Sequence, residues 1–166
     1  MKLTEWLNVE HGVFLVQIKL LEELVQQKAP IAVCAAVVET LARALEAHDQ
    51  IEDRLLYPEL GQVLGNPPAL AAMKREHEEI ERLVRDIRND PSRQWQFERF
   101  AVLLTEHIER EIHFLFPMAE EYLSEERLTS MGNWYAMHAS ERTGRQGLHT
   151  RGSAPKPRPF GDQQAS

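Results

Sequence analysis

The chain has 166 residues, of which 43% are apolar and 27% are charged, and its formal net charge is −7. This length and composition are typical of one soluble globular domain with a core of its own. The negative charge argues against binding to nucleic acid or to an anionic membrane, and no apolar run approaches the length of a membrane span. The N-terminus lacks the continuous apolar block of a signal peptide, so we expect a cytoplasmic protein.

Apolar residues recur three and four positions apart along most of the chain, which predicts an all-α protein. Breaks rich in glycine, asparagine and proline divide it into four long helices and a short fifth one. Thr4 is expected to cap the first helix, while Asp90 and Pro91 are expected to cap and open the fourth. We expect helices over residues 4 to 27, 31 to 60, 68 to 88, 91 to 122 and 125 to 139.

One short pattern, H-x3-E-x5-P, occurs twice in the chain and is the main clue to function. Four residues are just over one helical turn, so each histidine lies on the same helix face as its glutamate. The prolines lack a backbone donor and are expected to kink or loosen their helices. The two copies are His48, Glu52 and Pro58 in the second helix and His107, Glu111 and Pro117 in the fourth.

In both copies the histidine and the glutamate fall within the apolar stripe that faces the core. The first and third helices show a similar interruption, with His11 and His77 as polar members of apolar stripes. A buried charge without a partner costs several kcal/mol, in a domain that is stable by only about 5–15 kcal/mol. These groups therefore require a compensating partner, and a metal cation is the obvious one.

The interruptions also lie at similar distances from the turns between helices. In an up-down bundle, residues equally far from a connecting turn lie at the same height. Counted from turns near residues 29, 65 and 91, interruptions on neighbouring helices differ by three or four residues, or about 5 Å. Six groups are therefore expected at one height in the core: His11, His48, Glu52, His77, His107 and Glu111.

The chemistry of this set, four imidazoles and two carboxylates without a thiolate, suits iron, manganese or zinc. Six donors exceed the needs of one tetrahedral zinc ion and suit two metals about 3.5–4 Å apart, bridged by the glutamates. Open positions would remain for water, a bridging oxide or O2. His113, His138 and His149 lie off this face or outside the bundle and are expected not to be ligands. Glu81 follows His77 by four residues but belongs to a charged, solvated face.

This arrangement resembles the hemerythrin-like, or HHE cation-binding, family over about residues 1 to 123. The resemblance is carried by the Glu10-His11 pair, the EHEEI run that begins at Glu76, and the two H-x3-E motifs, the second followed by LFP. It implies an antiparallel up-down four-helix bundle that holds two non-haem iron ions. It also implies that the six groups are the ligands, with Glu52 and Glu111 bridging the ions beside an oxide or hydroxide.

The chain departs from the oxygen-carrying members of that family in two places. Those members have a second histidine one turn before the third-helix ligand, where this chain has Met73. They also use an aspartate five residues after the fourth-helix histidine, where this chain has Glu111 four residues after it. The set is similar to that of bacterial variants with fewer histidines and two glutamates. A more open site favours redox chemistry with O2, peroxide or NO over reversible oxygen carriage.

Beyond the bundle of residues 1–123, we expect a short helical extension over residues 124–139. From residue 140 the composition shifts to glycine, proline, serine and arginine, which cannot bury enough apolar surface to fold. Residues 140–166 are therefore predicted to be a disordered tail. A protein partner would be contacted through this C-terminal segment.

Four functions remain open on the sequence. The first is the binding or sensing of O2 or NO at the di-iron centre. The second is an enzyme that reduces O2 or decomposes peroxide at the same centre. The third is iron handling, with the metal as cargo, and the fourth is a structural bundle whose polar cluster needs no metal. We favour the binding or sensing of a small diatomic ligand.

Overall fold

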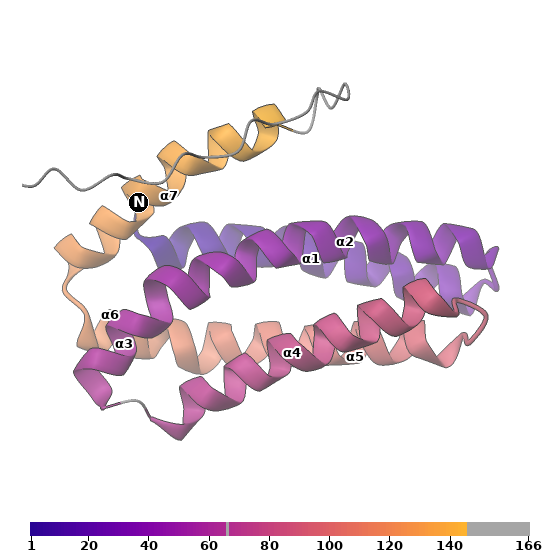
Figure 1. Ribbon diagram of the computed structural model, residues 1–166, viewed down its shortest axis with the longest axis horizontal. Coiled ribbons are helices and arrows are strands. Elements are labelled where there is room, and N and C mark those ends of the chain that lie inside the picture. Colours follow the sequence, from indigo (N-terminus) through magenta and orange to yellow (C-terminus); the bar gives the residue numbers. More distant parts are fainter. Residues whose placement is uncertain (66, 146–166) are drawn as a thin grey trace, which may run out of the picture.

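The computed structural model describes residues 1–65 and 67–145, and within these ranges every regular element is a helix (Figure 1). This confirms the all-α prediction, because each helix keeps its apolar residues on the face that it buries. The elements are α1 Leu3–Gln26, α2 Ile31–Ile51, η1 Glu52–Leu56, α3 Tyr57–Leu64, α4 Pro68–Asn89, α5 Trp95–Arg110, η2 Glu111–Leu115, α6 Phe116–Tyr122 and α7 Glu125–Arg145.

Four long rods run up and down to form a bundle (Figure 1). The first and third rods are α1 and α4, the second is α2 continued by η1 and α3, and the fourth is α5 continued by η2 and α6. Each rod packs against the next, and the fourth returns to pack against the first. Helix α7 then lies outside the bundle against α1. Gly132 permits this approach, since a Cβ atom there would collide with the Met1 carbonyl oxygen.

Two π-helical turns, η1 and η2, interrupt the second and fourth rods just before their prolines. Pro58 and Pro117 have no N–H to give to the carbonyl four residues back, so the helix widens there. The N–H groups of Tyr57 and Phe116 instead bond to carbonyls five residues back. The expected loosening therefore takes the form of a π-bulge, which is frequent at functional sites.

The core consists of two apolar clusters with a polar layer between them. On α1 the boundary falls between Leu7, which belongs to one cluster, and Phe14, which belongs to the other. On α4 the same boundary falls between Met73 and Ile80. In all four rods the predicted metal-binding residues lie in this gap, so both sides of the polar layer are closed by packed hydrocarbon.

Two helix starts differ from the expectations. Thr4 does not cap α1, because that helix begins at Leu3 and the Thr4 hydroxyl donates to Glu120 Oε1 at 2.8 Å. Asp90 does not cap α5, which begins only at Trp95. The Asp90 carboxylate instead accepts hydrogen bonds from the backbone and hydroxyl of Ser92, which closes a turn ahead of the helix. In both cases the short polar side chain found another partner, as such residues readily do.

The C-terminal helix is longer than the sequence suggested. Helix α7 begins at Glu125 as expected but continues to Arg145, beyond the predicted end at residue 139. Residues 146–166, most of the predicted disordered tail, lie outside the described residues. Across the two described ranges, none of the helices combines the length and the apolar character that a membrane crossing needs.

Candidate metal centre

The six predicted groups meet in the polar layer of the bundle. Each of these residues is at most 4% exposed, and they come from all four rods. The turn-counting expectation that they share one height therefore agrees with the structure. The residues are His11 from α1, His48 from α2, Glu52 from η1, His77 from α4, His107 from α5 and Glu111 from η2.

The donor atoms fall into two groups, each of which could hold a metal ion. Within each group the potential ligand atoms all lie within 4.8 Å of one another. Glu52 belongs to both groups, so the two positions share a carboxylate. We call the group around His11 and His48 the first half and the group around His77 and His107 the second half. The first comprises His11, His48, Glu52 and Glu111, and the second comprises Asp49, Glu52, His77 and His107.

The imidazole spacing in both halves is that of two ligands on one metal ion. The Nε2 atoms of His11 and His48 are 3.0 Å apart, and those of His77 and His107 are 3.1 Å apart. Two nitrogens that bind one ion at about 2.1 Å, at right angles to each other, are about 3.0 Å apart. The spacing of each histidine pair is therefore compatible with one ion in each half.

Two outer carboxylates fix the orientation of one histidine in each half. Glu10 accepts a hydrogen bond from Nδ1 of His48 at 2.8 Å, and Glu76 accepts one from Nδ1 of His107 at 3.0 Å. In the neutral imidazole, a proton on Nδ1 leaves the Nε2 lone pair free to bind a cation. Such carboxylate–histidine pairs are the usual second shell of protein metal sites.

The electrostatics of the layer show how strongly its charges depend on one another. Burial alone would lower the pKa of both His77 and His107. The carboxylates of Glu111 and Glu52 raise the pKa of His77 to about 11, and those of Glu111 and Glu76 raise the pKa of His107 to about 9. Burial would raise the pKa of Glu111, but the histidines around it hold that pKa well below its usual value. Without a metal, protons on the histidines would supply the positive charge that the carboxylates require.

Several buried polar atoms in the layer make no hydrogen bond within the described chain. Such atoms indicate whether the layer can accept a metal ion, because a bound cation would satisfy the oxygen atoms among them. They include Glu52 Oε1, Asp49 Oδ1 and the Nδ1 atoms of His11 and His77. Leaving such a group buried and unsatisfied costs about 1–3 kcal/mol or more when it is charged. Oxygen and imidazole donors left without hydrogen bonds at this density fit cations of the iron, manganese or zinc type.

Asp49 is a candidate ligand that the sequence reading missed. It lies in the second half with Oδ1 3.8 Å from Nε2 of His77, and burial raises its pKa to about 7 against the opposing effect of the histidines. It sits one residue after His48, about 100° around the helix, so it points across the bundle to the next rod. The signal was an acidic residue directly beside a predicted ligand, but only the rotation of the helix decides whether that residue turns inward.

Tyr57, the residue before Pro58, also reaches the centre. Its hydroxyl lies 3.3 Å from Glu52 Oε2, 3.2 Å from Glu111 Oε1 and 3.4 Å from Nε2 of His77. Burial and the two carboxylates raise its pKa well above the usual value, so the hydroxyl keeps its proton. The centre therefore contains one protonated phenol that can donate a hydrogen bond.

The remaining sequence candidates lie away from the centre. His113 is exposed on the surface of η2, and Glu81 pairs with Arg85 on an exposed face of α4. His138 lies on α7, where its Nδ1 contacts the carbonyl oxygen of Trp134. His149 is outside the described residues.

Taken with the bundle, this layer defines a helical protein that carries a metal-binding site in its core. Residues 2–119 match the family model of the hemerythrin HHE cation binding domain, so the chain belongs to that family. The match confirms the resemblance and covers the four rods up to Ala119, while α7 lies beyond it. Comparison with curated proteins and with solved structures gives no match.

Proposed function

We propose that the chain is a non-haem di-iron protein that binds or senses a small diatomic ligand, O2 or NO. The sharing of Glu52 between two groups of donors is the observation that carries this proposal. It supports two adjacent ions with a common carboxylate. The donor set of imidazole and carboxylate suits iron, and also manganese or zinc. When bound, two irons supply open coordination positions and the electrons that O2 or NO can accept.

In this proposal the chain's own residues hold, orient and shield the ions. His11 and His48 serve one ion, His77 and His107 serve the other, and Glu111 assists Glu52 as the second shared carboxylate. Glu111 lies 3.0 Å from Nε2 of His11 and 3.2 Å from Nε2 of His107, which supports contact with both halves. The apolar clusters above and below the layer exclude bulk water, so charges within it interact strongly.

We propose that Tyr57 donates a hydrogen bond to the bound diatomic ligand. Its protonated hydroxyl is buried beside both shared carboxylates and can turn toward an acceptor between them. A hydrogen bond from a phenol stabilises negative charge that develops on O2 or NO when electrons move toward it. The same observation favours the second candidate, a redox enzyme acting on O2 or peroxide, because a hydrogen bond from the phenol also stabilises the charge of a reduced product.

The first experiment is metal analysis of protein purified without oxygen, followed by visible spectra on adding O2 or NO. The di-iron proposal expects about two irons per chain and new charge-transfer bands with either gas. Bands that reverse when the gas is removed support binding, whereas conversion to an oxidised form with turnover of peroxide supports the enzyme. A folded chain that takes up no iron would overturn the proposal.

Tyr57→Phe separates the two candidates. For a binding or sensing protein, loss of the hydroxyl should weaken O2 or NO binding by about tenfold, the value of one hydrogen bond to a charged acceptor. For an enzyme it should slow turnover while leaving the initial binding bands intact. Tyr122→Phe, at an exposed tyrosine, is the matched control and should change neither.

A further inference from the structure

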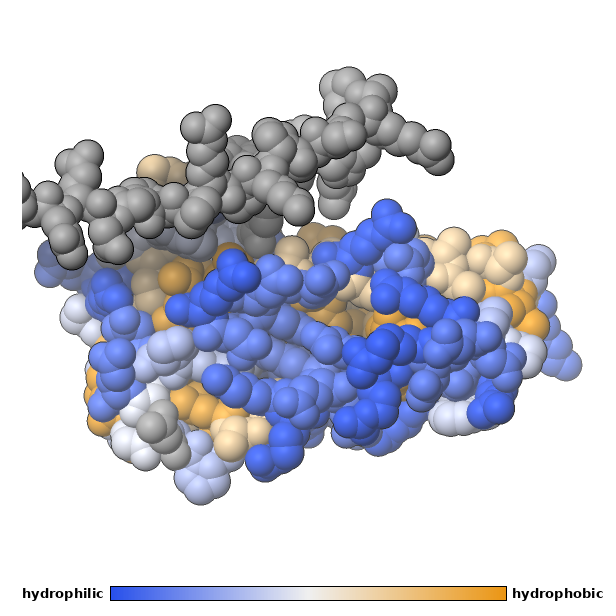
Figure 2. Space-filling view, viewed as in Figure 1, coloured by the Kyte–Doolittle hydropathy of each residue, from blue (hydrophilic) through white to orange (hydrophobic). Residues whose placement is uncertain are grey.

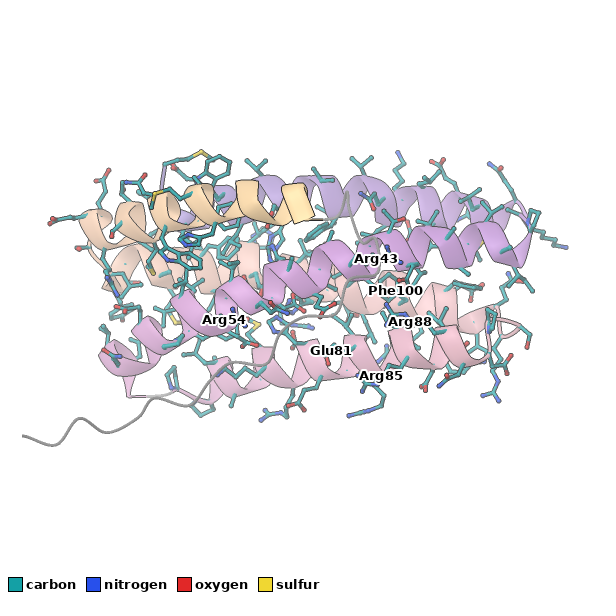
Figure 3. The ribbon with its side chains drawn as sticks, turned by 45° about the horizontal axis from the view of Figure 1, so that its top comes forward. Arg43, Arg54, Glu81, Arg85, Arg88 and Phe100 are labelled. Carbon is teal, nitrogen blue, oxygen red and sulfur yellow. The ribbon has the colours of Figure 1, made fainter. Side chains whose placement is uncertain are left out.

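A cavity of about 210 Å³ lies between α2 and α4, on the polar face of the bundle. Hydrophilic side chains cover most of this face (Figure 2), and Glu81, Arg85 and Arg88 follow one another along α4 beside α2 (Figure 3). The inner wall of the cavity is apolar and includes Leu45 and Ile80. The cavity therefore leads from a charged surface toward the core.

Asp49 joins this cavity to the metal centre. It lines the cavity and also belongs to the second half of the donor set. The residue is 6% exposed, and its Oδ1 makes no hydrogen bond with any described residue. The other donors of the centre are at most 4% exposed, so an ion needs a path through the bundle to reach them.

Glu46 provides a carboxylate at the outer part of the same path. It is exposed, lines the cavity and lies three residues before Asp49, so both are on one face of α2. The arginines of the cavity are already compensated, because Arg88 pairs with Glu39 at 2.8 Å and Arg85 pairs with Glu81 at 3.5 Å. Glu46 makes no ion pair with any residue that the structure describes, so its negative charge is available to a cation.

We propose that this cavity is the route by which a divalent metal cation enters and leaves the centre, with Glu46 as the outer and Asp49 as the inner transfer carboxylate. The inference rests on the proposed metal centre and adds how that centre is loaded. A hydrated cation sheds water only when other oxygens replace it, and two carboxylates on one helix face offer that exchange in steps. The ion then reaches the second half first.

The test is the rate at which metal-free protein takes up Fe²⁺ without oxygen, followed by competition with a chromogenic chelator. Glu46→Lys should slow uptake by about tenfold at low ionic strength, and the effect should shrink at high salt because exposed charges are screened. Glu46→Gln should give a smaller loss in the same direction. The final iron content of both variants should equal that of the wild type, because Glu46 is outside the donor groups.

Glu98→Lys is the matched control, since it makes the same charge change beside a different cavity, between α1 and α5. It should load at the wild-type rate. Equal slowing by Glu46→Lys and Glu98→Lys would mean that only net charge matters and would overturn the route. Wild-type uptake by Glu46→Lys would overturn it as well, while leaving a two-iron protein and hence the proposed function intact. A wild-type chain that binds no iron would overturn the centre itself.

Discussion

The two halves of the centre share one design, in which a helix carrying a Glu-His pair faces a helix carrying an H-x3-E motif. In the first half, Glu10 holds His48 on the neighbouring rod, and in the second half Glu76 holds His107. The aromatic residue before each motif proline stacks on a histidine of the opposite half, Phe116 on His11 at 5.2 Å and Tyr57 on His77 at 5.8 Å between ring centroids. The repeated motif therefore forms the same kinds of carboxylate–histidine and aromatic–histidine contact in both halves.

The halves differ in the polarity of their equivalent positions. The residue after the motif histidine is Asp49 in one copy and Ile108 in the other, and the aromatic residue is Tyr57 in one copy and Phe116 in the other. Asp49 and Tyr57 both point toward His77, so the additional polar groups gather in the second half. Each half has four candidate donors. The second half has the additional phenol of Tyr57 beside it, whereas the positions equivalent to Asp49 and Tyr57 in the other copy are apolar.

The outer carboxylates also have different supports. Glu76 is held by Arg110, whose Nε lies 3.0 Å and 3.1 Å from its two oxygens, so its support comes from within the bundle. Glu10 accepts a hydrogen bond from the Tyr135 hydroxyl of α7, which lies outside the region matched by the family. The first half is therefore linked to α7 through Glu10, while Glu76 of the second half is held by a residue of α5.

Glu52→Ala is expected to have the largest effect, because it removes the one residue common to both halves. Iron content should fall from about two ions per chain to fewer than one, whereas His11→Ala or His77→Ala should each remove only about one. Metal analysis, with circular dichroism to confirm that the helices remain, measures this. Two ions retained in Glu52→Ala would show that the halves are independent sites.

Asp49→Asn should reduce the difference in polarity between the halves. It keeps the side-chain size but removes a charged donor from the second half, so the affinity there should fall by about 100-fold or more, above the loss typical of outer partners. Titration with Fe²⁺ should then show one tight and one weak site. Two sites of unchanged affinity would mean that Asp49 only lines the cavity.

Glu10→Ala and Glu76→Ala test the shared design. Each should weaken metal binding in its own half by about 10–100-fold, because the histidine it holds loses its fixed tautomer and orientation. Glutamine at either position should restore part of the loss, since its carbonyl oxygen still accepts the Nδ1 proton. Titrations in His77→Ala and His11→Ala backgrounds isolate one half at a time. A loss in the opposite half would contradict the pairing.

The second half should also bind metal in a pH-dependent way. Without metal, the surrounding carboxylates raise the pKa of His77 to about 11 and that of His107 to about 9, so this histidine pair holds protons at pH 7.5 that a metal ion would displace. A metal ion needs the neutral imidazole, so binding must release protons, and affinity should rise with pH by up to about tenfold per unit for each proton. Calorimetry in buffers of different ionisation enthalpy counts these protons. A pH-independent affinity between pH 7 and 9 would contradict the assignment.

Tyr135→Phe is expected to have the smallest effect. It tests whether Glu10 and Glu76 are held by different parts of the protein. Loss of one hydrogen bond to Glu10 should weaken binding in the first half by less than about tenfold, in keeping with a net value of roughly 0.5–1.5 kcal/mol. The second half should be unchanged. An equal effect on both halves would indicate general loosening of the bundle, for which Tyr122→Phe is the control.

Much of this architecture was predictable because it depends on local periodicity. The 3.6-residue repeat predicted the four rods, and spacings of four placed His48 with Glu52 and His107 with Glu111. Counting residues from the turns then brought all six groups to one height. The helix starts at Thr4 and Asp90 were mispredicted, because a short polar side chain can bond to several partners with similar energy.

The sequence by itself determined the helices, the buried polar layer and the six predicted donors, because these follow from short-range spacing and from the cost of burying charge. Only the tertiary structure decided which groups face each other between rods. The contacts of Glu10 with His48, of Asp49 with the second half and of Tyr135 with Glu10 join residues 28 to 125 positions apart. They depend on the rotation and offset of whole helices, which are set by packing over the full length of the bundle.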